Sequence, residues 1–431
     1  MRSFMEFMER YFVPVAAKIG GQRHLVAIRD GFISIMPLIL AGSFAVLLNN
    51  TLFTWVPTLD FLKGIGGNVW WGTFAIMTLL VVFSTGYHLA KGYSIDGLAA
   101  GLISVGAFLA VTPQAHGDAG WGYIHWGYLN ATGLFTGLIV ALIATEIFVK
   151  LIKKNIIIKM PDSVPPAVGK AFAAVIPGVV TLFIFGIIAF IITKLNANSL
   201  YDLIFNAIQK PLQGFSQGVG SAVVLTMLIS LFWFFGLHGG NIMDPIMNSL
   251  YLPALEANAT AVQQGLAAPN MITRAFFDCY VNLGGAGATL ALILAIFLVS
   301  KKKREYREVA KLSAPLGLFQ INESVMFGLP LVLNPLMIIP FIIIPGVLTF
   351  TAWLATYAGI IPPTYIAIPW ITPVGIGAFL ATGGNLLAGL MALINFAIAT
   401  VIYIPFVALA DRMNMEKKEK ESLSSDTSVK M

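Results

Sequence analysis

The sequence predicts an all-α polytopic membrane protein, and this prediction rests on composition and on the lengths of the apolar runs. Of the 431 residues, 58% are hydrophobic and 11% are charged, against about 25% charged residues in a soluble globular chain. Mean hydropathy is +0.84. Several runs contain about 18 or more residues without a charge, which is enough to cross a bilayer as a helix.

Ten apolar segments are expected to cross the membrane. Basic residues around Arg23 and Arg29, at Lys91 and in KLIKKNIIIK (150–159) place the N-terminus and the ends of the second and fourth segments in the cytoplasm. We therefore assign the formal charge of +6 to cytoplasmic loops and expect no nucleic-acid partner. The segments cover residues 30–48, 70–89, 95–112, 130–151, 167–193, 218–237, 283–300, 331–355, 361–381 and 385–410.

Differences in polarity divide the chain into five parts. Residues 1–29 carry apolar and charged side chains at helical spacing, which is typical of an amphipathic helix in the membrane interface. Residues 30–195 and 218–410 are the two membrane halves, joined by a polar, amphipathic connector over 196–217. The tail, 411–431, is rich in Lys, Glu and Ser after Met413, and we expect it to be cytoplasmic and without fixed structure.

The second half contains irregular segments. The seventh apolar segment runs into KKKR at 301–304, and these cations belong in the cytoplasm only if part of 238–282 enters the membrane without crossing it. In the stretch 309–334, two short apolar arms flank the polar tip QINES. Irregular backbone at membrane depth is tolerated where it lines a cavity, so these breaks predict a binding site.

Two ionisable residues stand alone in apolar surroundings. Glu323 is the only Asp, Glu, Lys, Arg or His between residues 312 and 410. His238 lies between Lys210 and Asp244 with no charged residue in between. A carboxyl inside a membrane protein is costly, which favours a function for Glu323, although helix capping is the alternative. His238 precedes two glycines at a helix break and could also be purely structural. We expect both residues to converge on one polar substrate.

Aromatic and amide side chains suggest a sugar as that substrate. Trp370 and Trp233 are candidates to stack on a sugar ring, with the interfacial aromatic belt as the alternative. Asn241, which offers a donor and an acceptor, and Asn282 are candidates for its hydroxyls. No P-loop and no metal-ligand spacing occurs in the sequence, so we expect neither ATP, nor a cofactor, nor a metal.

Two motifs in combination resemble a known family. GLHGGNIMDPIMNSL (236–250) and GLFQINESVMFGLPLVLNP (317–335) are similar to enzyme IIC, the membrane subunit of the bacterial phosphoenolpyruvate-dependent sugar phosphotransferase system, in its lactose/cellobiose/N,N'-diacetylchitobiose branch. The resemblance covers nearly the whole chain from MERYFVPVAAKIGGQRHL (8–25) onward. The usual second motif reads I-N-E-P, whereas Ser324 replaces the proline here.

The resemblance implies a homodimer in the bacterial inner membrane, with ten spanning helices, two re-entrant hairpins and cytoplasmic termini. It implies that the first half forms the dimer interface and that the second half carries the sugar and moves as a body. It also implies that the chain is the membrane component of a protein-phosphocysteine–sugar phosphotransferase. A phosphocysteine on a separate cytosolic IIB subunit, supplied in turn by enzyme I, HPr and IIA, phosphorylates the C6 hydroxyl of the sugar. The lone cysteine, Cys279, lies in a membrane-associated stretch, so the donor acts in trans.

The motif histidine and glutamate of the family correspond to His238 and Glu323. A carboxylate in an apolar setting is poorly solvated, which suits Glu323 as general base, while His238 orients the same hydroxyl. The alternative is an ion-coupled disaccharide symporter with Glu323 as its proton site, and a channel comes third. Cellobiose is the first expected substrate, followed by diacetylchitobiose and then lactose.

Overall fold

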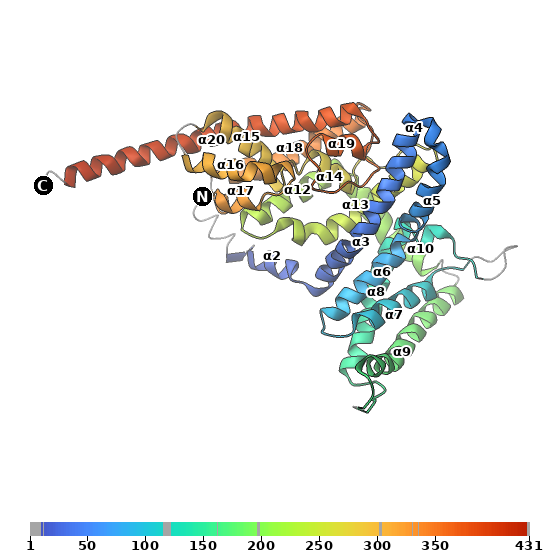
Figure 1. Ribbon diagram of the computed structural model, residues 1–431. Coiled ribbons are helices and arrows are strands. Elements are labelled where there is room, and N and C mark those ends of the chain that lie inside the picture. The colour runs from blue at the N-terminus through green and yellow to red at the C-terminus, as the bar shows by residue number, and fades with distance from the viewer. Residues whose placement is uncertain are drawn as a thin grey trace. The chain divides into compact units, whose positions relative to one another are not determined.

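The computed structural model describes a helical protein (Figure 1). By length and apolar composition, six helices of the described residues can cross a membrane, and a seventh arises if the bent pair Leu200–Ser216 and Val219–Phe234, at 80°, counts as one span. The six are Arg23–Asn50, Pro57–Lys91, Leu134–Lys153, Pro166–Lys194, Ile338–Tyr357 and Leu386–Asp411. The described residues are 10–11, 13–114, 122–161, 163–195, 199–300, 304–329, 331–334 and 336–428.

Beyond these six helices and the bent pair, three of the ten expected spans are shorter or absent as helices. The segments 95–112 and 283–300 correspond to the short apolar helices Gly97–Val111 and Ala286–Val299. The prediction of a span over 361–381 is wrong, because only α19, Ile376–Ala381, is helical there. Prolines at 362, 363, 369 and 373 explain the difference, since each lacks the N–H that a helix interior needs.

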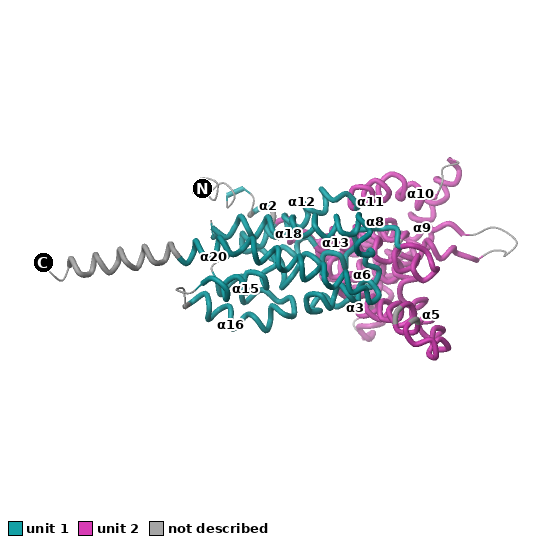
Figure 2. The backbone as a smooth tube through the Cα atoms, turned by 90° about the horizontal axis from the view of Figure 1, so that it is seen from above, with its two compact units in different colours: residues 1–17, 217–243, 268–431 teal, residues 18–216, 244–267 magenta. Residues whose placement is uncertain are grey.

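The chain packs as two compact units, which Figure 2 distinguishes by colour. Unit 1 comprises residues 1–17, 217–243 and 268–431, and unit 2 comprises residues 18–216 and 244–267. Helix α13, Gly239–Gln263, contributes its first turn to unit 1 and the remainder to unit 2.

Unit 2 is built around α6, which packs against α3, α7 and α8, while α9 covers α7 and α8. Its core contains the buried side chains of Val82, Phe108, Val140 and Phe185. Small residues let these helices approach closely, as membrane helices commonly do. The principal helices are α3 (Arg23–Leu47), α5 (Lys63–Trp71), α6 (Met77–Lys91), α7 (Gly97–Val111), α8 (Leu134–Lys153), α9 (Pro166–Lys194), α10 (Leu200–Ile204) and α11 (Lys210–Ser216). The short helix α2 (Val13–Gly20) begins in unit 1 and ends in unit 2.

Unit 1 consists of helices separated by irregular segments. Helix α12 packs on α18, α18 on α20, α20 on α15, and α15 on α16. The helices α16 and α17 pack together as a hairpin whose tip is residues 319–322. The helices are α12 (Val219–Phe234), α14 (Arg274–Tyr280), α15 (Thr289–Val299), α16 (Arg304–Leu318), α17 (Glu323–Gly328), α18 (Ile338–Tyr357), α19 (Ile376–Ala381) and α20 (Leu386–Ser428).

The structure describes the two ends of the chain only in part. Most of the predicted apolar face of the N-terminal helix lies outside the described residues, and α3 already begins at Arg23, within the expected interfacial segment. At the other end, the bounds of α20 are Leu386–Ser428, and the expectation of no fixed structure after Met413 stays a prediction.

Candidate functional site

His238 lies in the break between α12 and α13 of unit 1. The chain turns at Gly236, whose φ of 77° favours glycine and whose N–H donates to the Trp233 carbonyl at 2.9 Å. Helix α13 then begins at Gly239, where an added Cβ would lie 2.0 Å from the Ile229 carbonyl oxygen. The glycines of this motif therefore bring the start of α13 against the end of α12, with His238 at the junction.

The imidazole of His238 is oriented on two sides. Its Nδ1 accepts a hydrogen bond from the Asn241 backbone N–H at 3.0 Å, so the proton of the neutral ring lies on Nε2. The Trp233 ring packs against it with centroids 4.4 Å apart. Trp233 is 4% exposed, so it offers little surface for a sugar. We expected Trp233 to stack on substrate, and the structure places it as a support for His238.

Glu323 lies at the first position of α17, directly after the hairpin tip. Its Oε1 is 3.8 Å from Nε2 of His238, as expected for two breaks that meet at one place. This distance is too long for a hydrogen bond, but a hydroxyl oxygen could lie about 2.8 Å from both atoms. The two side chains are 45% and 51% exposed within the chain. The Glu323 carboxylate is thus more open than the apolar sequence around it suggested, and a ligand can reach it.

The other predicted site residues occupy different positions in unit 1. Asn241 contributes its backbone to His238, and its side chain is exposed. The Asn282 amide donates to the Asp278 carboxylate at 3.3 Å, so α14 fixes it from one side. Trp370 lies in the irregular segment before α19 and is 48% exposed, which leaves its ring free to contact a ligand. No interaction between Trp370 and the His238–Glu323 pair is observed among the described residues.

Sequence reasoning missed two polar residues of the hairpin tip. Asn322 is 5% exposed and its amide donates to the Ala286 carbonyl at 3.2 Å. Gln320 is 6% exposed and bonds to the backbone of two other segments. The sequence shows that the tip QINES is polar, but its isolated charge points to chemistry at Glu323 alone. A run of amides in an apolar region was the signal, because buried amides need partners.

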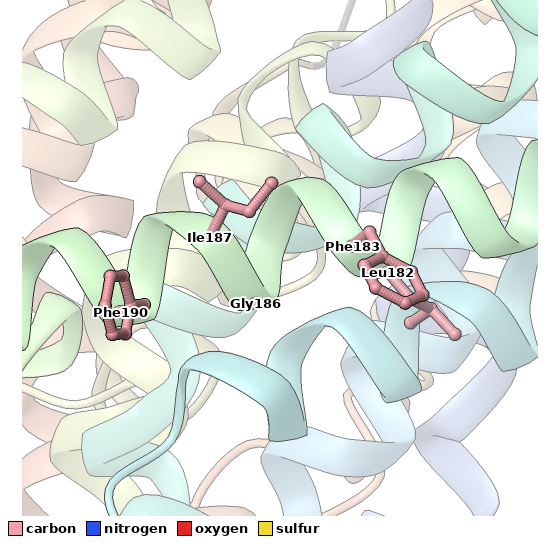
Figure 3. A pocket seen from close by; sticks show the side chains of 5 residues that line it. All are labelled: Leu182, Phe183, Gly186, Ile187 and Phe190. Carbon is pink, nitrogen blue, oxygen red and sulfur yellow. The ribbon is translucent and has the colours of Figure 1, made fainter.

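An apolar hollow elsewhere is not suited to a sugar. It lies along α9 in unit 2 and is lined by Leu182, Phe183, Gly186, Ile187 and Phe190 (Figure 3). None of these side chains can bond to a hydroxyl, so the hollow fits lipid chains or protein better than a saccharide. No cluster of three or more metal-ligating side chains occurs among the described residues. Cys279 is 2% exposed.

Comparison with known proteins points to the same family as the two sequence motifs. Residues 29–345 match the family model described as "Phosphotransferase system, EIIC". The chain is 36% identical to the oligo-beta-mannoside-specific EIIC component of Bacillus subtilis (strain 168), over 99% of this chain and 100% of that protein. It is 34% identical to the cellobiose-specific EIIC component of Lactococcus lactis subsp. lactis (strain IL1403), over 96% and 99% of the two chains.

The fold is also similar to a solved structure. The transporter ChbC, the IIC component of an N,N'-diacetylchitobiose-specific phosphotransferase system, matches with a TM-score of 0.89 and 35% identity, over 96% of this chain and 99% of that chain. The chain therefore belongs to the phosphotransferase system EIIC family. It is a helical membrane component of phosphotransferase sugar transport, as its motifs indicated.

Proposed function

We propose that this protein binds a β-linked disaccharide, carries it across the bacterial inner membrane and holds it for phosphorylation at its C6 hydroxyl. The observation that carries the proposal is the 3.8 Å separation of His238 Nε2 and Glu323 Oε1, both accessible at the ends of two chain breaks. One hydroxyl placed between them accepts from the imidazole N–H and donates to the carboxylate.

The geometry suits phosphoryl transfer from a separate protein. The phosphocysteine of a IIB subunit approaches the held hydroxyl in line, the S–P bond breaks as the new O–P bond forms, and Glu323 takes the hydroxyl proton. IIB is then recharged by IIA, HPr and enzyme I. Cys279 is buried, which supports a donor in trans. The phosphorylated sugar carries new negative charge. Once Glu323 has passed its proton to water and is ionised again, the two negative charges repel, which favours release of the product to the cytoplasm.

The substrate class is supported by the residues available and by the relatives. A half-exposed Trp370 suits stacking on a sugar ring, and amide side chains suit its hydroxyls. The similar proteins are named for oligo-beta-mannosides, cellobiose and N,N'-diacetylchitobiose. We place cellobiose first for this chain, diacetylchitobiose second and lactose third.

We further propose a division of labour between the two membrane halves. Residues 30–195 form the interface of a homodimer, and residues 218–410 carry the sugar and move as a body. Both termini lie in the cytoplasm, where the basic ends of α3, α6 and α8 also belong by the positive-inside rule. Chemical cross-linking in membranes tests the dimer, and accessibility of terminal tags tests the orientation.

The variant Glu323→Gln tests the general-base role. The amide still bonds to a hydroxyl but cannot take its proton, so disaccharide affinity stays within about tenfold while phosphorylation by phosphorylated IIB falls by about 10²–10⁴-fold. Glu308→Gln is the control, because Glu308 is an exposed carboxylate on α16 that pairs with Lys311 at 3.0 Å. Phosphorylation by Glu323→Gln at near the wild-type rate would exclude Glu323 as the base.

A further inference from the structure

Gln320, in the tip between α16 and α17, has an unusual backbone for its residue type. Its φ is 65°, in the left-handed region that glycine and asparagine favour. Its side chain is 6% exposed. A glutamine held in this conformation, where glycine would be less strained, indicates that the side chain itself is required.

The carboxamide of Gln320 joins two segments that are distant in the sequence. Its Oε1 accepts a close hydrogen bond from the Gly284 N–H, 36 residues earlier in the chain. Its Nε2 donates to the Thr372 carbonyl, 52 residues later, at 3.1 Å. One buried amide therefore uses both of its ends to hold three irregular segments of unit 1 together.

Each of these segments carries a residue of the candidate site close to the bond. Glu323 follows Gln320 by three positions, Asn282 precedes Gly284 by two, and Trp370 precedes Thr372 by two. The bond to Thr372 is thus the connection between the hairpin tip, which carries the proposed base, and the segment that carries the proposed stacking ring.

The two bonded segments are themselves tight turns. Gly284 has a φ of 87°, and an added Cβ there would lie 2.2 Å from Cβ of Leu290. Thr372 closes a turn in which its N–H donates to the Pro369 carbonyl at 2.9 Å and its Oγ1 donates to the same oxygen at 2.6 Å. Because each turn is fixed internally, the Gln320 amide sets the position of one turn relative to the other.

We propose that Gln320 is a positioning residue of the sugar site, whose carboxamide holds the Trp370 segment in register with the hairpin tip that bears Glu323. This inference rests on the proposed function for the roles of Trp370 and Glu323. Its structural core, that Gln320 orders residues 369–375, can be tested without sugar.

Gln320→Glu is the sharpest variant because it preserves size and keeps an acceptor for Gly284 N–H. The carboxylate replaces the Nε2 donor with a second acceptor, which repels the Thr372 carbonyl. We expect faster amide hydrogen exchange over residues 369–375 in the sugar-free protein, with little change at Gly284. Gln320→Met loses both bonds without adding charge, so both segments should exchange faster. If Gln320→Glu does not fold, Gln320→Met still tests whether Gln320 orders residues 369–375.

The functional readout is a double-variant cycle with Trp370→Ala. We expect Trp370→Ala to weaken disaccharide binding at least fivefold in the wild-type background and less than twofold in Gln320→Glu, because a displaced ring no longer contributes. A wild-type protein that binds no disaccharide would contradict the proposed function, and the exchange data would still decide the positioning role.

Asn395→Asp is the matched control. Asn395 is fully buried in the same unit, and its amide donates to the carbonyls of Tyr280 at 2.9 Å and Leu348 at 3.0 Å. This variant should lower thermal stability while leaving both exchange at 369–375 and the contribution of Trp370 unchanged. The proposal is overturned if Gln320→Met, which can make neither bond, leaves exchange at 369–375 at the wild-type level, or if Trp370→Ala weakens binding equally in the wild type and in both Gln320 variants.

Discussion

At the scale of the residue, one ring nitrogen of His238 accepts a backbone hydrogen bond and the other faces the Glu323 carboxylate. Nδ1 is occupied by the Asn241 N–H at 3.0 Å, which leaves Nε2 on the side of Glu323. The buried Trp233 ring supports the imidazole from another direction. A histidine fixed in this way serves better as an oriented hydrogen-bond donor than as a mobile proton carrier, in agreement with the proposed role of Glu323 as the proton acceptor.

The two residues should therefore act on catalysis as a unit. We expect the double variant His238→Ala with Glu323→Gln to phosphorylate sugar barely more slowly than the worse single variant, because removing either residue already disorders the reacting geometry. Values of kcat/KM for the four proteins measure this coupling. Strictly multiplicative losses would mean that the two side chains act at separate places. His24→Ala, which removes a histidine bonded to Glu146 at 3.0 Å, should combine multiplicatively with Glu323→Gln.

Trp370 supplies a second test at this scale. If its ring stacks on the sugar, Trp370→Ala should weaken binding by about 1–2 kcal/mol, or roughly 5- to 30-fold in Kd. Titration of purified protein with cellobiose measures this change. Trp71→Ala is the control, because Trp71 in unit 2 is 52% exposed against 48% for Trp370 and packs with Trp126 instead. Equal affinity of the wild type and Trp370→Ala for cellobiose would mean that Trp370 belongs to the interfacial aromatic belt and does not contact the sugar.

At the scale of the element, hydropathy predicted most helices and the presence of breaks. The isolation of His238 and Glu323 in the sequence correctly identified two breaks that meet, because an ionisable residue in apolar surroundings needs a special place. Hydropathy failed over 361–381, where four prolines prevent a helix although the composition is apolar. The partners of Gln320 lie 36 and 52 residues away, and no local pattern reports such long-range bonds.

Ser324 at the hairpin tip offers a test of this element. It occupies the second position of α17, and its Oγ is buried without a hydrogen-bond partner among the described residues. The first turn of a helix tolerates proline, and the usual I-N-E-P motif of the family has proline at the position of Ser324. We expect Ser324→Pro to stabilise the protein by about 0.4–1 kcal/mol, since it restricts the unfolded chain and removes an unsatisfied hydroxyl.

Thermal unfolding of purified Ser324→Pro, compared with Ser324→Ala, separates these two causes. The alanine variant removes only the hydroxyl, so proline should give the higher Tm of the two. A proline variant less stable than Ser324→Ala would show that the tip needs a conformation that proline does not permit, and that this chain uses serine for that reason.

At the scale of the whole molecule, the proposed sugar site is combined with a single cysteine, whose thiol is buried. Cys279 is the chain's only cysteine, lies within α14 and is 2% exposed. Cys279→Ser should therefore leave phosphorylation by phosphorylated IIB within about twofold of wild type, because serine is nearly isosteric and the thiol has no part in the transfer. Complete loss of transfer with unchanged sugar binding would mean that a phosphocysteine forms on this chain.

The source of free energy for transport distinguishes the phosphotransferase from an ion-coupled symporter. In the phosphotransferase, phosphorylation traps the sugar inside, so proteoliposomes that contain phosphorylated IIB should accumulate sugar 6-phosphate with no imposed ion gradient. In a symporter with Glu323 as proton site, uptake would instead require a proton gradient and would yield unmodified sugar. Glu323→Gln should abolish accumulation under either mechanism. The chemical form of the accumulated sugar and the effect of a protonophore therefore distinguish the phosphotransferase from the symporter. Accumulation of phosphorylated disaccharide in the presence of the protonophore supports the phosphotransferase, whereas uptake of unmodified sugar that the protonophore stops would contradict it.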